Sequence, residues 1–192
     1  MPPKPLPLSA PTRRADAERN RDKILAAARA AFADPDAQVS MAEISRRAGV
    51  GMATLYRNFP GRAELLEALF TDEVDAICEA AQDNLDGQPP GPALLAWLHR
   101  FFAFATTKHH VVPELLTYSE SSNPIFGESR ARVLAAGRPL LAAAQRTHAV
   151  RDDLTLEQIL DMILAIAAIH REPDYLEPIL QAALDGLRPR PT

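Results

Sequence analysis

The chain is 192 residues long and 47% hydrophobic, so it is large enough to bury a substantial core. Its one cysteine, Cys78, excludes a disulfide within the chain, and no apolar run approaches the roughly 20 residues that span a bilayer. The net charge of −4 argues by itself against a nucleic-acid partner, yet basic residues predominate up to Arg62 and acidic residues predominate after it. That division is typical of a DNA-binding domain joined to an acidic one.

Residues 1–15 are predicted to form a disordered basic arm. Prolines recur through this segment, and Lys4, Arg13 and Arg14 give it positive charge. Two interpretations remain open: the arm touches phosphates or enters the minor groove of DNA, or it is a solvated tail whose charge adds only diffuse attraction. Because the segment lacks the apolar core of a signal peptide, we expect a cytoplasmic protein without a membrane partner.

The first predicted helix runs from about Asp16 to Ala33. It carries an apolar stripe that would face a core, made by Ile24, Leu25, Ala28, Ala31 and Phe32. The helix is predicted to end at Asp34-Pro35-Asp36. The periodicity is helical along the rest of the chain, and no convincing alternating strand occurs, so the sequence predicts an all-α fold of about nine helices.

Two short helices joined by a tight turn are predicted between Ser40 and Arg62. Ser40 is the expected N-cap of a helix from Met41 to Ala48, and Glu43 stands three residues later, as in a capping box. Gly49 allows the positive φ that the turn requires.

The second short helix, from Met52 to Phe59, is stopped by Pro60-Gly61. Leu55 and Phe59 lie one turn apart and are predicted to point inward. The opposite face holds Ala53, Thr54 and Arg57, so it is thin at its start and cationic at its end. Such a face suits a helix that enters the major groove of DNA.

The sequence from Ala48 to Phe59 (AGVGMATLYRNF), followed by Arg62–Leu66 (RAELL), resembles the helix-turn-helix signature of TetR-type transcriptional regulators. The resemblance extends from about Glu18 to Phe70. Gly51 stands where the family usually has Ser, so the second helix should lack a side-chain cap.

The resemblance implies a dimeric, DNA-binding regulator, more often a repressor, that a small molecule releases from its operator. It implies an organisation into the arm, a helix-turn-helix domain over 16–62 and a helical ligand-binding and dimerisation domain over 63–192. The residues expected to hold phosphates are Ser40, Thr54, Tyr56, Asn58 and Arg62. Those expected to face base edges are Ala42, Met52, Ala53 and Arg57, while Arg46 either binds a phosphate or is merely exposed.

After Arg62 a long helix is predicted to reach about Leu85 and to link the two domains. Further helices are predicted over residues 92–107, 113–120, 126–148, 155–169 and 174–187. The family implies that the last two helices pair with those of a second subunit. The residues assigned to that interface are Leu156, Ile159, Leu160, Ile163, Ala167, Ile179 and Ala183.

Aromatic residues of the C-terminal part could line a ligand cavity or be ordinary core: Trp97, Phe101, Phe104, Tyr118 and Phe126. We find no phosphate loop, nucleophile elbow or metal-ligand spacing, so we expect no enzyme activity, metal or cofactor. Three other hypotheses remain: a DNA-binding regulator without an effector, an all-α enzyme that carries this motif, and a protein–protein adaptor.

Overall fold

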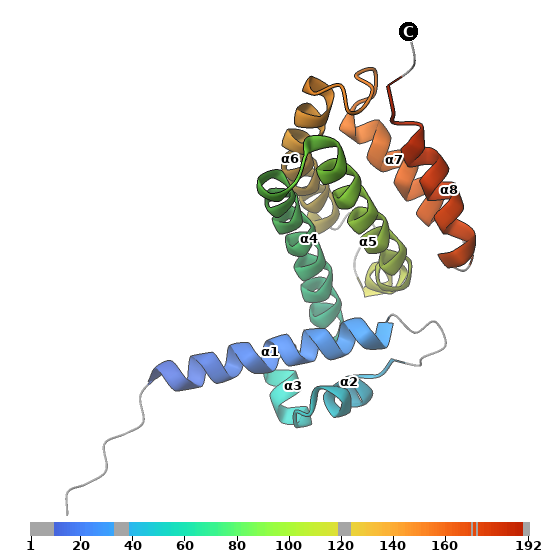
Figure 1. Cartoon of the computed structure of the whole chain (residues 1–192). Coiled ribbons are helices and arrows are strands. Elements are labelled where there is room, and N and C mark those ends of the chain that lie inside the picture. Colours follow the sequence, from blue (N-terminus) through green and yellow to red (C-terminus); the bar gives the residue numbers. More distant parts are fainter. Residues whose placement is uncertain (1–9, 33–38, 119–123, 170, 172, 190–192) are drawn as a thin grey trace, which may run out of the picture. The chain divides into compact units, whose positions relative to one another are not determined.

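The computed structural model describes residues 10–32, 39–118, 124–169, 171 and 173–189. Within those ranges the chain is entirely helical and contains no strand (Figure 1), which confirms the predicted all-α fold. The helices are α1 (Ala10–Phe32), α2 (Met41–Ala48), α3 (Met52–Asn58), α4 (Arg62–Gly87), α5 (Pro90–Tyr118), α6 (Pro124–Arg146), α7 (Leu156–Ala167) and α8 (Pro173–Asp185). They form two compact units, Met1–Leu69 and Phe70–Thr192.

Two helices extend further than the sequence predicted. Helix α1 begins at Ala10, so residues 10–15 of the expected disordered arm are helical. A proline is compatible with this start, because Pro11 lies in the first turn, where a backbone N–H has no partner within the helix. Helix α5 runs through Pro113, so the two segments expected over 92–107 and 113–120 are one helix, and eight helices replace the expected nine in the described ranges. One lost hydrogen bond at a proline bends a long helix without ending it.

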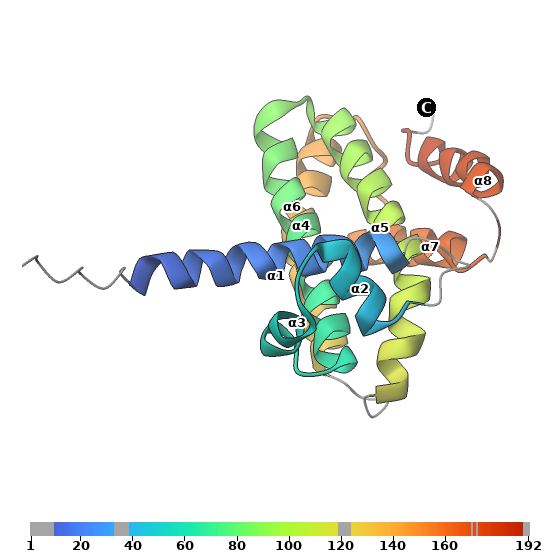
Figure 2. The ribbon, with the colours of Figure 1, turned by 90° about the horizontal axis from the view of Figure 1, so that it is seen from below.

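In the first unit, α1 packs against both short helices. The predicted stripe on α1 is buried from Ile24 to Phe32, and Ile44 of α2 and Leu55 of α3 are fully buried in the helices that α1 contacts. Figure 2 shows α2 and α3 beside each other with α1 passing behind them. The apolar stripe of α1 therefore holds the helix pair together and leaves the outer sides of α2 and α3 exposed.

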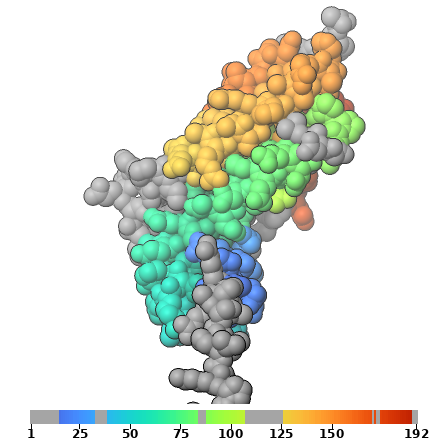
Figure 3. All heavy atoms as spheres, turned by 90° about the vertical axis from the view of Figure 1, so that its left-hand side faces the viewer, coloured from blue at the N-terminus to red at the C-terminus, as the bar shows by residue number. Residues whose placement is uncertain are grey.

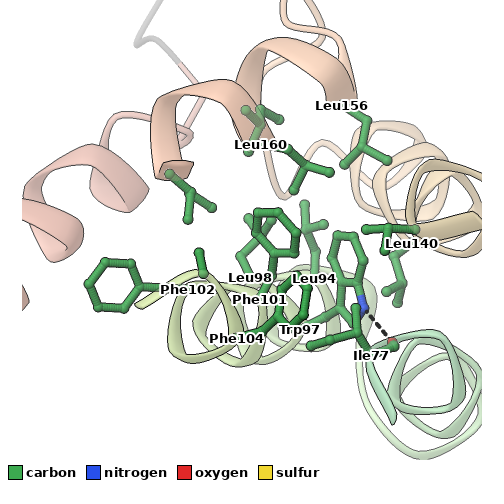
Figure 4. Close-up of a cluster of buried hydrophobic side chains, with 14 of the residues drawn as sticks. Ile77, Leu94, Trp97, Leu98, Phe101, Phe102, Phe104, Leu140, Leu156 and Leu160 are labelled. Carbon is green, nitrogen blue, oxygen red and sulfur yellow. Dashed lines mark hydrogen bonds between the residues drawn. The ribbon is translucent and has the colours of Figure 1, made fainter. Parts of the chain in front are cut away.

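In the second unit, α5 packs against α6 and α7, and α7 packs against α8. The core is centred on Trp97 of α5, which is fully buried and donates from Nε1 to the carbonyl oxygen of Ile77 in α4 at 3.0 Å. Figure 4 shows Trp97 and Phe101 extending from α5 towards Leu156 and Leu160 of α7. The aromatic residues of α5 thus join α4 and α7 in one apolar cluster.

Helix α6 is tied to its neighbours by ion pairs between exposed side chains. Arg132 pairs with Asp75 of α4, and the space-filling view shows α6 lying along α4 (Figure 3). Two further pairs connect α6 to α7: Arg130 with Asp161 at 3.0 Å, and Arg138 with Glu157 at 2.9 Å. No helix in the described ranges is both long enough and apolar enough to cross a membrane.

Candidate nucleic-acid interface and ligand cavity

The turn between α2 and α3 has the geometry that its sequence predicts. The Ser40 hydroxyl accepts from the backbone N–H of Glu43 at 3.1 Å, which confirms Ser40 as the N-cap of α2. Gly49 has φ of 65°, and its N–H donates to the carbonyl oxygen of Arg46. The buried Ser45 donates from its hydroxyl to the carbonyl oxygen of Val50 at 2.6 Å. These bonds fix where α3 begins.

The Glu43 carboxylate does not complete the capping box. It accepts from Nε and Nη2 of Arg46 at 2.9 and 2.7 Å and from Nε of Arg47 at 2.7 Å. Two guanidinium groups bind a carboxylate more strongly than the backbone N–H of the N-cap does, which explains the difference. The hydrogen bonds from Arg46 and then Arg47 lower the pKa of Glu43 to about 2, and the bond from Glu43 raises the pKa of Arg46. The carboxylate therefore balances part of the charge on the outer side of α2.

Helix α3 divides into a buried and an exposed side as predicted. Leu55 is fully buried and Phe59, at the C-cap, is 1% exposed. Gly51 is the N-cap and makes no side-chain capping bond, which confirms the expected consequence of its replacing Ser. The remaining predicted contact residues of α3 lie on the outer side or at its edge: Met52, Ala53, Tyr56 and Arg57 are exposed, and Thr54 and Asn58 are half-buried.

Contacts within the helix order the polar end of this outer side. Arg57 donates from Nη2 to the Thr54 hydroxyl at 2.9 Å, and Asn58 donates from Nδ2 to the Thr54 carbonyl oxygen at 2.8 Å. Met52 is 39% exposed and Tyr56 is 46% exposed, so two large apolar side chains flank these polar groups in solvent. Exposed Met, Tyr and Arg on one short helix provide apolar contact and hydrogen-bond donors for base edges.

Arginines outside α3 make contacts inside the same unit. Arg62 donates to the Val39 carbonyl oxygen, and its guanidinium lies over the Phe32 ring at 5.3 Å from the centroid. Arg21 of α1 lies over the Phe59 ring at 4.8 Å. Arg62, predicted as a phosphate contact, therefore also has a structural role, because it connects the start of α4 to α1 and to the residue before Ser40.

The predicted contact residues of α2 lie on its outer side. Ser40, Ala42 and Arg46 are exposed, and Arg46 is held by Glu43. The first unit thus gathers all the residues that were expected to touch DNA, from the N-cap of α2 to the start of α4. Their individual contacts with bases and phosphates stay predictions.

The second unit contains a cavity of about 210 Å³ between α4, α5, α6 and α7. Its lining residues are Phe70, Val74, Phe101, Phe104, Phe126, Ser129, Arg130, Val133, Leu160 and Leu164. Phe101, Phe104 and Phe126 were predicted. Trp97 was also predicted, but it is fully buried beside the cavity with its ring stacked on that of Phe101 at 6.1 Å. The side chain of Tyr118 lies outside the described residues.

The cavity residues on the other helices were not predicted from the sequence. Phe70 and Val74 keep an i, i+4 spacing on α4, which predicts a shared apolar side but not that this side lines a cavity. Ser129 and Val133 on α6, and Leu160 and Leu164 on α7, keep the same spacing, but only the packing of four helices brings these residues together around one cavity. Within the described ranges, no group of three or more His, Cys, Asp or Glu side chains could hold a metal ion.

Most residues assigned to a subunit interface are buried inside the single chain. The exposed fraction is at most 3% for Leu156, Ile159, Leu160, Ile163 and Ala167. These side chains are not available to a second subunit, because α7 turns its broad apolar face towards α5, α6 and α8. Ile179 and Ala183 of α8 are only half-buried, and Tyr175, one turn earlier, is 58% exposed.

Comparisons with known proteins agree with this architecture. Residues 24–69 match the family model of bacterial regulatory proteins of the tetR family, and residues 89–189 match the C-terminal domain of SbtR-like transcriptional regulators. A TetR transcriptional regulator from Streptomyces coelicolor, SCO0520, has a TM-score of 0.78 and 37% identity, covering 89% of this chain and 99% of that one. A TetR transcription regulatory protein from Mycobacterium vanbaalenii has a TM-score of 0.75 and 34% identity, covering 92% and 99%.

A search of curated proteins found no match. The two family models cover the helix-turn-helix residues and most of the second unit, and both solved structures are similar along almost their whole length. The chain therefore belongs to the TetR family of DNA-binding transcriptional regulators.

Proposed function

We propose that the protein is a homodimeric repressor that reads double-stranded operator DNA with α3 and is released when a small molecule fills the cavity of the second unit. The observation that supports operator reading most directly is the composition of α3. Its inner residues Leu55 and Phe59 are buried, while Met52, Tyr56 and Arg57 extend into solvent from a helix anchored on both sides by short turns.

In this proposal α3 lies in the major groove. Arg57 pairs with a guanine, Met52 and Ala53 contact thymine methyl groups, and Ala42 of α2 approaches the base edges. Phosphates are held by Ser40, Thr54, Tyr56, Asn58 and Arg62, with Arg46 as a further cation. The exposure of Tyr56 and Arg57 supports these assignments, and the contact of Arg62 with Val39 would place its charge at the start of α4.

A second subunit would pair along the part of α8 that the single chain covers only in part. Tyr175, Ile179 and Ala183 follow one another at i, i+4 spacing on this helix, and Ile169 after α7 is 37% exposed. Pairing there would bury these apolar side chains and repeat α3 about a two-fold axis. Two copies of α3 in successive major grooves of one DNA face are roughly 34–36 Å apart, which defines a near-palindromic operator.

The ligand response would pass through α4. Its first residues up to Leu69 belong to the first unit, and its residues Phe70 and Val74 line the cavity of the second. A molecule that binds the cavity better in one α4 arrangement than in another shifts the population towards that arrangement. Repression is relieved when, in the favoured arrangement, the distance between the two α3 helices no longer matches the distance between the half-sites of the operator.

Selection of bound DNA from a random duplex pool, followed by a screen for molecules that release it, tests this function. We expect an enriched site with two related half-sites, and at least one small molecule that lowers affinity for it. If a DNA site is enriched but no molecule releases it, the result would favour a DNA-binding regulator that has no small-molecule effector. No enrichment at all would contradict the proposal.

A further inference from the structure

The chemistry of the cavity walls restricts what it can bind. Among the residues that the structure describes, ten line the cavity; eight of these are apolar, and four of the eight are phenylalanines. The Phe70 ring meets the Phe126 ring edge to face at 5.2 Å, and the Phe104 ring lies 6.1 Å from Phe70 and 5.9 Å from Phe101. Aromatic rings prefer such tilted and edge-to-face neighbours, so a flat aromatic guest can join this arrangement more favourably than a saturated chain.

The volume limits the guest to about one ring with its substituents. The cavity holds about 210 Å³, whereas a dry apolar cavity of about 150 Å³ is known to admit benzene. A single ring with one or two small substituents fits the remaining space.

The two polar residues in the described part of the lining are both hydrogen-bond donors. They are Ser129, which is 7% exposed, and Arg130, and they are adjacent on α6. Arg130 pairs with Asp161 through a single bond from Nη2 at 3.0 Å, whereas a guanidinium carries five N–H donors. No acidic side chain is among the lining residues that the structure describes. This end of the cavity therefore favours a hydrogen-bond acceptor, and Arg130, whose side chain is 47% exposed and shared with Asp161, adds a positive charge there.

From these three features we infer that the cavity takes a compact, single-ring aromatic molecule with one carboxylate or similarly acidic group, whose ring lies among the phenylalanines and whose charge meets Arg130 and Ser129. The inference rests on the proposed function, in which this cavity is the effector site, and it specifies the class of effector. The anion would share Arg130 with Asp161, so binding would weaken one of the ion pairs between α6 and α7.

Four probes on the full chain test the ligand class. Benzoate, benzyl alcohol and benzylamine share one ring and differ in charge, and octanoate carries the carboxylate on a chain instead of a ring. Calorimetry gives the affinities, and the fluorescence of Trp97, the single tryptophan of the chain, reports binding beside Phe101. We expect benzoate to bind most tightly, benzyl alcohol about tenfold more weakly and benzylamine not at all. Benzylamine or octanoate as the tightest probe would overturn the inference, as would no binding by benzoate.

The Arg130→Gln variant locates the charge contact. It should lower benzoate affinity about tenfold and leave benzyl alcohol unchanged, because only the anion uses the guanidinium. Arg138→Gln is the matched control, since Arg138 pairs with Glu157 between the same two helices without lining the cavity. Equal losses in the two variants would overturn the assignment to Arg130. If Arg130→Gln does not fold, the ranking of the four probes on the unmodified protein still decides.

The ligand class and the proposed function can fail separately. Benzoate that binds in the expected order without loosening operator DNA supports the ligand class and contradicts its role as the effector class. Release of the operator by a cationic or long-chain molecule that displaces no benzoate overturns the ligand class and leaves ligand-controlled repression in place.

Discussion

Two glycines of α6 give opposite predictions for the same substitution. A Cβ added to Gly137 would meet the Trp97 ring, with Cζ3 at 2.7 Å, and Leu156 Cδ2 at 3.0 Å. A Cβ added to Gly127 would meet no atom of the described residues within 4 Å. Both lie within α6, so Gly→Ala adds helix propensity at each, about 0.5–1 kcal/mol in favour of folding. Only the Gly137 variant must also move the indole.

The expected destabilisation by Gly137→Ala follows from that displacement. Overpacking a filled core costs about 1–3 kcal/mol. Moving Trp97 also strains its hydrogen bond to the Ile77 carbonyl, worth about 1 kcal/mol. After subtraction of the propensity gain, Gly137→Ala should lower the free energy of unfolding by about 1–3 kcal/mol. Gly127→Ala should raise it by about 0.5–1 kcal/mol.

Denaturant unfolding at one fixed protein concentration measures both variants. Circular dichroism follows the helices, and Trp97 fluorescence follows the core of the second unit. Since the two substitutions share the propensity term, the difference between their unfolding free energies isolates the contact with Trp97. Equal stabilities for the two variants would refute the packing of α6 against α5 described here.

Five further substitutions, with Glu79→Gln as a control, test the interface and the subunit contact. Arg57→Ala should weaken operator binding by about 1–3 kcal/mol and random duplex binding much less, as measured in competition titrations; equal losses would contradict base reading. Arg62→Ala should lower the affinity for every duplex and reduce the slope of log affinity against log salt concentration by about 0.9; an unchanged slope would reject the phosphate role. The same variant should lower the melting temperature, because it loses the contacts with Val39 and Phe32. Glu43→Gln should raise the affinity for random duplex, because it frees Arg46 and Arg47 from their ion pairs. The gain should be the same from about pH 5 to 8, because the pKa of Glu43 is about 2 and the carboxylate is ionised throughout that range. The control Glu79→Gln, on the exposed surface of α4, should give no gain, and equal affinities for the two variants would reject this reasoning. Ile163→Asp should unfold the chain, since Ile163 is fully buried. Ile179→Asp should leave the chain folded but monomeric, as measured by light scattering. A folded monomer from Ile163→Asp would contradict the assigned core.

The first unit was largely predictable because its signals are local. Ser40 at the N-cap, Gly49 in the left-handed region and the i, i+4 pair Leu55 and Phe59 each act within a few residues, and each is found as predicted. The exception is the Glu43 carboxylate. By its position in the sequence, this carboxylate can accept from the N–H of the N-cap or from either of two arginines. Only the relative strength of these hydrogen bonds decides which of them form.

In the second unit the helices could be predicted from the sequence, but which of their faces stay exposed could not. Periodicity shows that Ile163 and Ile179 both lie on apolar faces, but it does not show which face the chain covers itself. Three neighbouring helices bury Ile163, and Ile179 stays half-exposed. The cavity had the same difficulty, since Arg130 and Leu164 meet the phenylalanines only through the packing of helices far apart in the sequence.

Hydroxyl-radical footprinting of the purified protein on its selected DNA tests the central claim most directly, that α3 reads the major groove as one of a symmetric pair. The account predicts two protected tracts of equal length, roughly one helical turn apart on one face of the duplex, both lost together in Arg57→Ala. A single tract, protection at arbitrary positions, or no protected tract would contradict it.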